Sequence, residues 1–570
     1  MAKLFEPIKI RRVDIPNRIV MPAMTTRLAG PDGVVTPELV EYYLARAEGG
    51  AGLITVEMGS PDAAGRHRAR ELGIFHDRFL PGLRDLTTQL RAAGARTSVQ
   101  VGHAGGHTRQ DVTGFPPVAP SALAHVVQEV NTRTVVPQAL TRDGIRAVVQ
   151  AFAEATERAK RAGFDMVELH GAHGYLIAQF LSPLDNHRAD EYGGNLENRA
   201  RFAIEVVEAC RQRVGDFPLI FRLSADEYAP GGVTLDEAKQ VSRWLVEVGV
   251  DALHISAGCY RALPSGAIMT PPMGYPQGVF LHLSEAIKAS VDVSVIAVGR
   301  LHDPALAERV IVDGQADMVA LGRQLIADPQ WPRKTREGRG DEIRPCISCN
   351  ACVDGMRDGS RIQCLVNPAA GREHQYRPAS TDRPRSVLVV GGGPAGMEAA
   401  RLLALRGHRV VLCEQSDRLG GQLRLAASAP IFQNVETNAT VLETFVEYLA
   451  RQLDKAGIEV RLGQPVTPHL VQRLKPDVVL LATGASYRFP FRWILPRWLD
   501  SPWSRGRLAK WLIKKPAVRR LFYYGVRRSN AGLYAGLRQS GGEVKRIGDC
   551  NRLGKTMEAM ADAAELASAL

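Results

Sequence analysis

The feature that most constrains the fold is a regular alternation of short apolar runs and helical patterns over residues 1–340. The apolar runs read as strands, and they are residues 18–21, 53–57, 97–101, 166–170, 219–222, 252–256, 295–298 and 318–321. Eight parallel strands, each followed by a helix, predict a (β/α)8 barrel with loop insertions. An open doubly wound sheet is the alternative, but it usually has fewer strands for this length. In a barrel, the catalytic residues lie at the carboxyl ends of the strands.

The seventh and eighth predicted strands run into two Gly-Arg pairs, Gly299-Arg300 and Gly322-Arg323. Barrels commonly bind a phosphate at the loops after these strands, because glycine lets backbone amides approach and arginine neutralises the charge. One such pair is a weak signal, whereas two at corresponding positions are stronger. We therefore expect a phosphorylated cofactor here.

The fourth predicted strand ends in His170, and His173 and Tyr175 follow it closely. Two imidazoles and a phenol can hold the oxygen of a carbonyl substrate and supply a proton. A metal pair, or polar residues of a packed loop, are the alternatives. No carboxylate or further histidine is spaced to complete a metal site, so substrate binding is the favoured interpretation.

Four cysteines, Cys346, Cys349, Cys352 and Cys364, follow the predicted barrel. Three of them share one tight loop, which suits an iron-sulfur cluster, most simply [4Fe-4S], better than a zinc site built from two separated Cys-x-x-Cys pairs. Zinc or structural cysteines are the alternatives. The motif lies between two predicted domains, where a one-electron relay would have to be.

The region after residue 385 carries a dinucleotide-binding pattern. An apolar run at 386–390 leads into Gly391-x-Gly393-x-x-Gly396, and a second predicted strand ends at Glu414. The glycines admit a pyrophosphate to the helix N-terminus, and the acidic residue accepts a hydrogen bond from a ribose hydroxyl. The combination predicts a Rossmann-like domain that binds an adenine dinucleotide.

Several longer stretches resemble the old yellow enzyme family, whose members bind FMN at the top of the barrel. These stretches are Asn-Arg-Ile-Val-Met-Pro at 17–22, Gln-Val-Gly-His-Ala-Gly at 100–105, His-Gly-Ala-His-Gly-Tyr at 170–175, Gln-Phe-Leu-Ser-Pro at 179–183 and Asp-Glu-Tyr-Gly-Gly at 190–194. The order of barrel, cysteine motif and nucleotide fold is similar to the multidomain branch that contains 2,4-dienoyl-CoA reductase, 2-enoate reductases and trimethylamine dehydrogenase.

The resemblance implies which residues would hold FMN. Ala23, Met24 and Thr25 would line one face of the isoalloxazine. Gln100 would hydrogen-bond its pyrimidine edge, and Arg222 would lie near N1 to stabilise the anionic reduced ring. The residues that would bind the phosphate are Gly299, Arg300, Gly322 and Arg323.

The resemblance also assigns the substrate side. His170 and His173 match the pair that binds the carbonyl oxygen, and Tyr175 matches the tyrosine that protonates carbon. The amine dehydrogenases of this branch carry a flavin-linked cysteine at the position of Thr25 and a tyrosine at that of His170, which argues against amine oxidation. The dienoyl-CoA reductases carry a histidine where this chain has Tyr260, a second candidate proton donor.

Further residues resemble the FAD contacts of flavoproteins with two dinucleotide sites: Gly421, Gln422, Gly484 and Asp549, the last near the ribityl chain. Related reductases carry a second glycine fingerprint, for NAD(P)H, between the positions of Gly484 and Gly548. The chain has no such pattern in this interval and too few residues for the domain. We therefore expect FAD as the dinucleotide and no NAD(P)H domain.

The basic charge of the chain is concentrated in residues 487–528, where twelve Lys or Arg stand against one acidic residue, out of a net charge of +12. Four of the six tryptophans lie there as well. Residues 505–515 can place Leu508, Trp511 and Leu512 on one helical face with cations around it, the pattern of an interfacial helix. The segment is predicted to dock an electron donor, either a membrane with its quinone pool or a protein, the alternative being that it covers its own FAD domain.

Together these patterns predict a four-part chain: an FMN barrel at 1–340, a cluster segment at 341–376, an FAD fold at 377–486 and 543–570, and a basic Trp-rich insertion at 487–542. The predicted function is reduction of an activated C=C bond in an unsaturated carbonyl or acyl-CoA substrate. A dehydrogenase passing electrons outward, or a non-catalytic electron-transfer subunit, are the alternatives. No signal or spanning segment is seen, which favours a cytoplasmic enzyme, with peripheral membrane contact through 487–528. Nucleic-acid binding is not expected, and the oligomeric state is left open.

Overall fold

The computed structural model describes residues 2–129, 131–376, 379–432, 435–487, 511, 515, 518, 527–530, 532–537 and 542–570. The chain divides into two compact units. The first is Met1–Gly338 with Cys352–Ile362, and the second is Arg339–Ala351 with Gln363–Leu570.

The first unit is a closed parallel barrel, as the alternation predicts. Its strands, in chain order, are β3 (Ile19–Met21), β4 (Leu53–Ser60), β6 (Arg96–Val101), β11 (Met166–Gly171), β12 (Leu219–Ser224), β13 (Ala252–Ser256), β14 (Ser294–Ala297) and β15 (Met318–Ala320). Each strand pairs in parallel with the next, and β15 pairs with β3 to close the ring. The strands are buried on both faces, which is why they read as continuous apolar runs.

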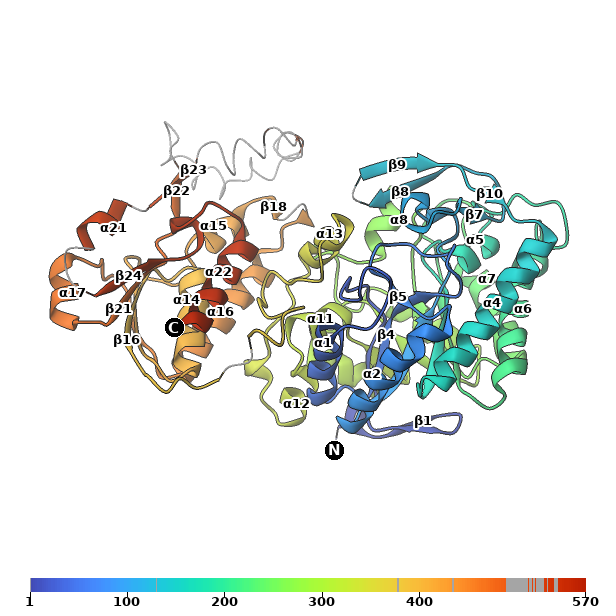
Figure 1. Cartoon of the computed structure of the whole chain (residues 1–570), viewed down its shortest axis with the longest axis horizontal. Helices are drawn as coiled ribbons and strands as arrows, with labels where there is room; N and C mark the ends of the chain where they lie inside the picture. The colour runs from blue at the N-terminus through green and yellow to red at the C-terminus, as the bar shows by residue number, and fades with distance from the viewer. Residues whose placement is uncertain are drawn as a thin grey trace. The chain divides into compact units, whose positions relative to one another are not determined.

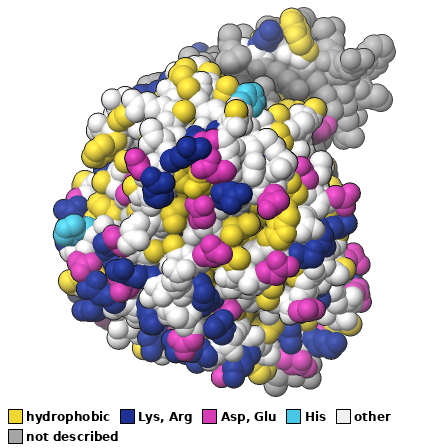
Figure 2. Space-filling model, turned by 90° about the vertical axis from the view of Figure 1, so that its right-hand side faces the viewer, with side chains coloured by type: hydrophobic (Ala, Val, Ile, Leu, Met, Phe, Trp, Pro, Cys, Tyr) yellow, Lys and Arg dark blue, Asp and Glu magenta, His cyan; other side chains and the backbone are white. Residues whose placement is uncertain are grey.

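Helices surround the barrel (Figure 1). The longer ones are α1 (Pro37–Glu48), α2 (Leu80–Ala92), α4 (Arg142–Arg161), α6 (Leu196–Val214), α7 (Leu235–Glu247), α9 (Leu281–Lys288) and α10 (Pro304–Val312). Several begin at a residue whose side chain accepts a hydrogen bond from the first turn, such as Thr36, Thr141 and Thr234. On the outer face of the barrel shown in Figure 2, Lys and Arg side chains alternate with Asp and Glu, as on an ordinary solvated surface.

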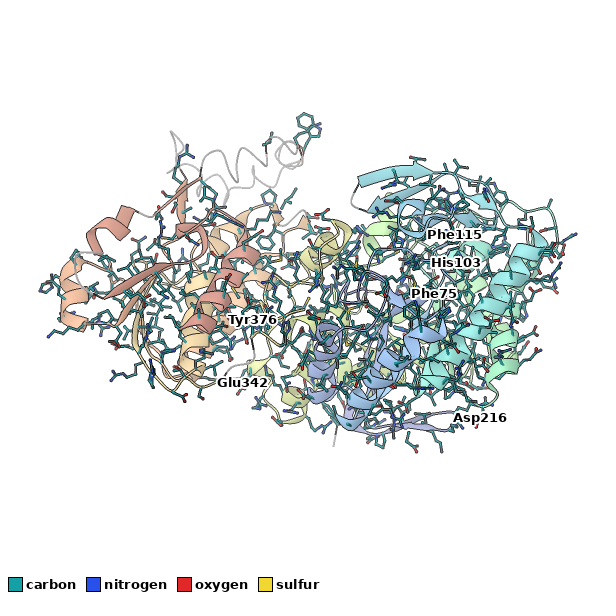
Figure 3. The ribbon with its side chains drawn as sticks, viewed as in Figure 1. Phe75, His103, Phe115, Asp216, Glu342 and Tyr376 are labelled. Carbon is teal, nitrogen blue, oxygen red and sulfur yellow. The ribbon has the colours of Figure 1, made fainter. Side chains whose placement is uncertain are left out.

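A short hairpin closes the amino-terminal end of the barrel. Strands β1 (Ile8–Ile10) and β2 (Val13–Ile15) pair antiparallel, and Ile10 and Ile15 pack against strand-initial residues such as Leu53 and Met166. Figure 1 shows this hairpin at the end opposite to β8 (His125–Glu129) and β9 (Asn131–Val135). Figure 3 places Asp216 at the hairpin end and His103 toward the other end. The open end for chemistry is therefore the carboxyl end.

The second unit is a Rossmann-like fold, also as predicted. Its parallel sheet contains β16 (Ser386–Val390), β17 (Arg409–Cys413), β20 (Glu459–Arg461), β21 (Val478–Leu481) and β24 (Glu543–Arg546), in the order β20-β17-β16-β21-β24. In Figure 1, α17 (Pro468–Leu474) covers one face, and α14 (Pro394–Leu405), α16 (Ala439–Lys455) and α22 (Thr556–Ala569) cover the other. The sheet order reverses beside β16, where such folds bind their ligand.

Two paired strands of the second unit flank most of the basic insertion. Strand β22 (Ala485–Tyr487) pairs antiparallel with β23 (Arg527–Ser529), so that Tyr487 lies opposite Arg527. Leu537, at the end of α21 (Gly532–Leu537), is buried in the core with Leu388 and Val479. Of residues 488–526, the structure describes only Trp511, Lys515 and Val518, so the predicted interfacial helix with Leu508 and Leu512 lies outside the described residues. None of the described helices is both long and apolar enough to cross a membrane.

Candidate active site at the carboxyl end of the barrel

The loop after β3 is held firmly at the mouth of the barrel. The backbone N–H and the hydroxyl of Thr26 donate to the two carboxyl oxygens of Glu57, at 2.5 and 3.0 Å. Burial raises the pKa of Glu57 to about 8, although these hydrogen bonds work against the rise. The preceding residues, Ala23, Met24 and Thr25, are only half-buried, so they stand at the rim of the site.

A polar layer crosses the inside of the barrel next to this loop. Gln100 on β6 lies opposite Glu168 on β11, and its Nε2 donates to Glu168 at 2.6 Å. The other oxygen of Glu168 lies 2.7 Å from Nδ1 of His254. Burial alone would raise the pKa of Glu168, but His254, Arg222 and His170 around it lower it to about 2. Glu168 is therefore an ionised carboxylate inside the barrel.

Arg222 completes this layer. In the strand register it lies between His170 on β11 and His254 on β13. It is 9% exposed, and its Nε has no hydrogen-bond partner among the described residues. A buried guanidinium with an unused donor fits an acceptor group of a bound ligand.

The two predicted phosphate arginines lie beside one short stretch of backbone. Arg300 donates to the carbonyl oxygens of Pro272 and Met273, at 3.3 and 3.2 Å, and Arg323 donates to that of Pro271 at 2.9 Å. Gly299 has φ +127, and a Cβ there would lie 2.9 Å from the ring of Phe280. Gly322 begins α11 (Gly322–Ala327). Two oriented arginines and a turn that only glycine fits can bind a phosphate group. The residues after β14 and β15 are therefore suited to the phosphate of FMN.

The predicted substrate histidines are buried together and uncharged. The ring centroids of His170 and His173 are 5.2 Å apart, and His173 Nε2 lies 2.7 Å from the hydroxyl of Ser256. Burial and the neighbouring Arg222 lower the pKa of His170 to about 3, and the pKa of His173 is well below its usual value for the same reasons. A neutral imidazole can donate one hydrogen bond to a carbonyl oxygen.

The two predicted tyrosines lie together because the loops after β11 and β13 run side by side. His173 and Cys259 form a parallel bridge, and the rings of Tyr175 and Tyr260 are 5.9 Å apart. Burial and Tyr260 raise the pKa of Tyr175. Burial also acts to raise the pKa of Tyr260, but the charges of Arg68 and Arg357 oppose burial, and the pKa is lowered.

Sequence reasoning missed three residues of this site. The ring of His67 is 5.4 Å from Tyr175, and that of His107 is 4.8 Å from Tyr260. Arg68 donates to the hydroxyl of Thr25 at 2.9 Å. Burial lowers the pKa of both histidines well below 6.5. His107 follows the 100–105 motif directly, whereas nothing around His67 and Arg68 marks them in the sequence.

The cysteine motif is divided between the two units. Cys346 and Cys349 belong to the second, where Ser348 N–H donates to the sulfur of Cys346 at 3.4 Å. Ser348 and Asn350 have φ of 49 and 58, a left-handed conformation that non-glycine residues adopt at a cost. A strained loop with an N–H donated to sulfur fits a thiolate site. Among the described residues no three His, Cys, Asp or Glu gather closely enough for a metal ion, so the cluster stays a prediction.

The dinucleotide glycines lie where the fingerprint expects them. Gly391 has φ +113, and a Cβ there would meet the carbonyl oxygen of Ala482 at 2.5 Å. Gly393 caps α14, and Gly396 lies in its first turn. Glu414 accepts from the N–H of Gly392 at 2.6 Å, which places its carboxylate beside the glycine loop. These residues fit a nucleotide held at the start of α14.

The remaining predicted FAD residues surround the same loop. Gly421 precedes α15 (Gln422–Ser428), and Gln422 donates to the carbonyl oxygen of Ala485, directly after Gly484. Asp549 accepts from the N–H of Gly554 at 2.8 Å and forms an ion pair with Arg527. The Asp549 carboxylate, which was expected to face the ribityl chain of FAD, is therefore already paired with Arg527.

Comparison with known proteins covers both units. Residues 3–342 match the family described as NADH:flavin oxidoreductase / NADH oxidase, and residues 386–488 match FAD dependent oxidoreductase. The chain is 44% identical to an NADH oxidase of Thermoanaerobacter brockii, over 85% of this chain and 73% of that protein. It is 36% identical to a cinnamate reductase of Clostridium sporogenes, over 85% of this chain and 74% of that protein.

Among solved structures, a 2-naphthoyl-CoA reductase in complex with 2-naphthoyl-CoA is similar, with a TM-score of 0.90 and 26% identity. The match covers 100% of this chain and 99% of that one.

Proposed function

Because the chain belongs to the NADH:flavin oxidoreductase / NADH oxidase family, the multidomain old yellow enzyme type of oxidoreductase, we propose that it reduces a carbon-carbon double bond conjugated to a carbonyl group. The observation that carries the proposal is the neutral pair His170 and His173 beside Tyr175, at the end of the barrel where Arg222 and Gln100 converge. The similar proteins named cinnamate reductase and 2-naphthoyl-CoA reductase act on substrates of this class.

FMN would be held by the loop of Ala23, Met24 and Thr25, by Gln100 and Arg222, and by the Arg300 and Arg323 pair, and it would supply the hydride for the β-carbon. His170 and His173 donate hydrogen bonds to the carbonyl oxygen of the substrate, which draws electrons from the double bond. Tyr175 then gives its phenolic proton to the α-carbon. The rings of His67 and His107 lie 5.4 and 6.3 Å from that of Tyr175 and would shield this proton from water.

The electron supply is the second part of the proposal. FAD at the glycine loop of Gly391 and a [4Fe-4S] cluster on Cys346, Cys349, Cys352 and Cys364 would bring electrons singly from a partner protein or quinone. A short route for the electrons is supported by the segment after Cys352, because Ile362 N–H donates to the carbonyl oxygen of Thr26 at 2.8 Å, next to the loop proposed to hold FMN. In this proposal the electrons come from the partner rather than from an NAD(P)H-binding domain of the chain.

The experiment is an anaerobic one on the isolated enzyme. The flavins are reduced with dithionite, and the reduced enzyme is mixed with cinnamate, an unsaturated ketone or an enoyl-CoA while flavin absorbance is followed. We expect reoxidation by at least one unsaturated compound and none by its saturated analogue. If no unsaturated compound reoxidises the flavin, and a saturated one reduces the oxidised enzyme, the protein is a dehydrogenase instead.

A further inference from the structure

One arginine closes the stretch of chain that carries the cysteine motif. Arg344 stands two residues before Cys346, and its Nη1 donates to the carbonyl oxygen of Val366, two residues after Cys364. The side chain therefore joins the two ends of a loop that contains all four cysteines of the motif. Arg344 is 6% exposed, so little water can compete for this hydrogen bond.

The same guanidinium is bonded to the nucleotide fold. Its Nη2 donates to both carboxyl oxygens of Glu398, at 3.0 and 3.2 Å. Glu398 is fully buried and lies on α14, the helix that begins directly after Gly393 of the glycine loop. The guanidinium of Arg344 also lies over the ring of Tyr448 on α16, 5.2 Å from its centre. These contacts fix the ends of the cysteine loop on α14 and α16.

Two arginines share the charge of Glu398. Arg401, one turn further along α14, donates to this carboxylate through Nη2 at 2.8 Å and through Nε at 3.1 Å. Burial alone would raise the pKa of Glu398, but Arg344 and Arg401 lower it to about 2, so the carboxylate is ionised. Among the described residues, the Arg401 side chain makes hydrogen bonds to Glu398 alone. Of the two arginines, Arg344 is therefore the one that also holds the cysteine loop.

We propose that Arg344 is a positioning residue of the iron-sulfur site, which closes the cysteine loop and anchors it to the nucleotide fold so that the thiolates are held ready for the cluster. This inference rests on the electron supply in the proposed function. Cys346, Cys349 and Cys364 belong to the same unit as Arg344. A loop whose ends are already fixed loses less conformational entropy when its thiolates bind the cluster.

The backbone inside the loop supports this role. Ser348 and Asn350 have φ of 49 and 58, the left-handed conformation that costs free energy for residues other than glycine. Such conformations persist where the surrounding structure imposes them. Arg344 supplies a constraint of this kind, because it joins both ends of the loop to α14. Groups that hold metal ligands from behind commonly change metal affinity by about 10- to 100-fold when they are removed.

The test is the rate at which the holoenzyme loses iron to a ferrous chelator in the absence of oxygen. Arg344→Met, which keeps a similar length and removes every donor, should lose iron about 10- to 100-fold faster than the native protein. Arg401→Met is the matched control, because it takes an equal charge away from Glu398 without touching the cysteine loop. This control should lose iron at the native rate. Flavin content and the thermal midpoint report the folding of each variant.

Two further variants separate the closed loop from the charge of Glu398. Arg344→Lys keeps a cation with donors and should recover part of the iron retention. Arg344→Met combined with Glu398→Gln leaves no unpaired buried carboxylate, and it should still lose iron rapidly because the loop stays open. A native rate of iron loss in Arg344→Met or in the double variant would overturn the proposal, as would an equal increase in Arg401→Met.

Iron loss is measured without any substrate, so its outcome is distinguishable from that of the flavin reoxidation experiment. A purified protein that contains no iron would overturn the role of Arg344 and leave the reduction of the double bond to be judged by reoxidation. Iron retention that depends on Arg344, in a protein that no unsaturated compound reoxidises, would support the positioning role and count against the proposed reaction.

Discussion

Gln100 donates its amide hydrogen to Glu168 at 2.6 Å, and this contact fixes which way the Gln100 amide points. An ionised carboxylate only accepts hydrogen bonds, so the nitrogen of Gln100 must face Glu168. Its carbonyl oxygen is then the atom left to accept a hydrogen bond, and in the proposed complex it accepts from an N–H of the flavin pyrimidine. His254 on β13 lies against the other oxygen of Glu168, so the orientation of the Gln100 amide is set from three strands away.

Glu168→Gln should therefore weaken FMN binding. A second amide next to Gln100 allows both side chains to flip, and losing one well-formed hydrogen bond costs about 1 kcal/mol, or about fivefold in affinity. The measurement is FMN affinity of the deflavinated protein by fluorescence quenching. Glu205→Gln on α6, a partly buried carboxyl bonded to Tyr192, is the control and should bind FMN normally. Unchanged affinity in Glu168→Gln would show that Glu168 does not orient Gln100.

Tyr175→Phe should slow reoxidation by an enoyl substrate and leave flavin reduction by dithionite nearly normal. The hydroxyl is the proton donor, and a positioned acid contributes about 10²- to 10⁴-fold. Stopped-flow absorbance separates the two half-reactions. Tyr192→Phe, which removes a hydroxyl bonded to Glu205, is the control. A decrease of less than threefold in Tyr175→Phe would make Tyr260 the direct donor to carbon.

Stability should fall at alkaline pH because of Glu57. Its folded-state pKa of about 8 lies above the ordinary 4.5, so the folded protein binds this proton more tightly than the unfolded chain. The contribution is complete below the unfolded pKa and is lost as pH rises through the folded pKa. Buried Glu71, with a pKa of about 7, acts in the same direction.

The check is the thermal midpoint between pH 5 and pH 9 for the native protein and Glu57→Gln. The variant should lose less stability over this range, with a remainder due to Glu71. Glu208→Gln, an exposed carboxyl on α6, should keep the native profile. A native-like profile in Glu57→Gln would mean that Glu57 is ionised at neutral pH in the folded protein.

The barrel strands could be predicted from the sequence because strands buried on both faces leave continuous apolar runs between helices. The predicted run 252–256 matches β13 at both ends, and 166–170 falls one residue short of β11. His170 and Tyr175 could be found because they end or follow such a run, whereas Gln100 is assigned through the family resemblance of the 100–105 motif.

The side-chain contacts between different strands could not be predicted from the sequence in the same way. Glu168 and His254 are single polar residues within apolar runs 86 positions apart, and only the barrel register brings them together. The carbonyl oxygens of Pro271 and Pro272 orient the phosphate arginines, but backbone acceptors have no residue signature.

Cys349→Ser should remove the iron-sulfur cluster and slow electron transfer between the flavins, because a hydroxyl does not replace a thiolate ligand. Iron analysis and stopped-flow reduction by an artificial donor measure the two effects. Cys210→Ser is the control, since Cys210 is buried on α6 against the hydroxyl of Thr156 and lies outside the motif. Full iron content in Cys349→Ser would exclude it as a ligand, and unchanged transfer in an iron-free variant would exclude the relay.

The last prediction concerns the basic segment 487–528. Trp511 is 54% exposed, and Nζ of Lys515 lies 4.6 Å from the centre of its ring, so an aromatic side chain and a cation stand together at the surface. Each basic residue near an anionic membrane contributes about 1 kcal/mol, so half of the twelve Lys and Arg of this segment would hold the protein at a bilayer. Binding to a membrane would bring the FAD domain within reach of a quinol.

Vesicle co-sedimentation tests this directly. We expect binding to vesicles of anionic lipid that weakens as salt is raised, because exposed charges are screened within about 10 Å at 0.1 M salt. Replacing Trp511, Lys514 and Lys515 by serine should abolish the binding. Replacing Lys239 and Arg243 by serine removes the same positive charge from α7 of the barrel and should leave it unchanged. Absence of binding at low salt would exclude the membrane, and it would leave either a soluble protein as the electron donor or a segment that covers its own FAD domain.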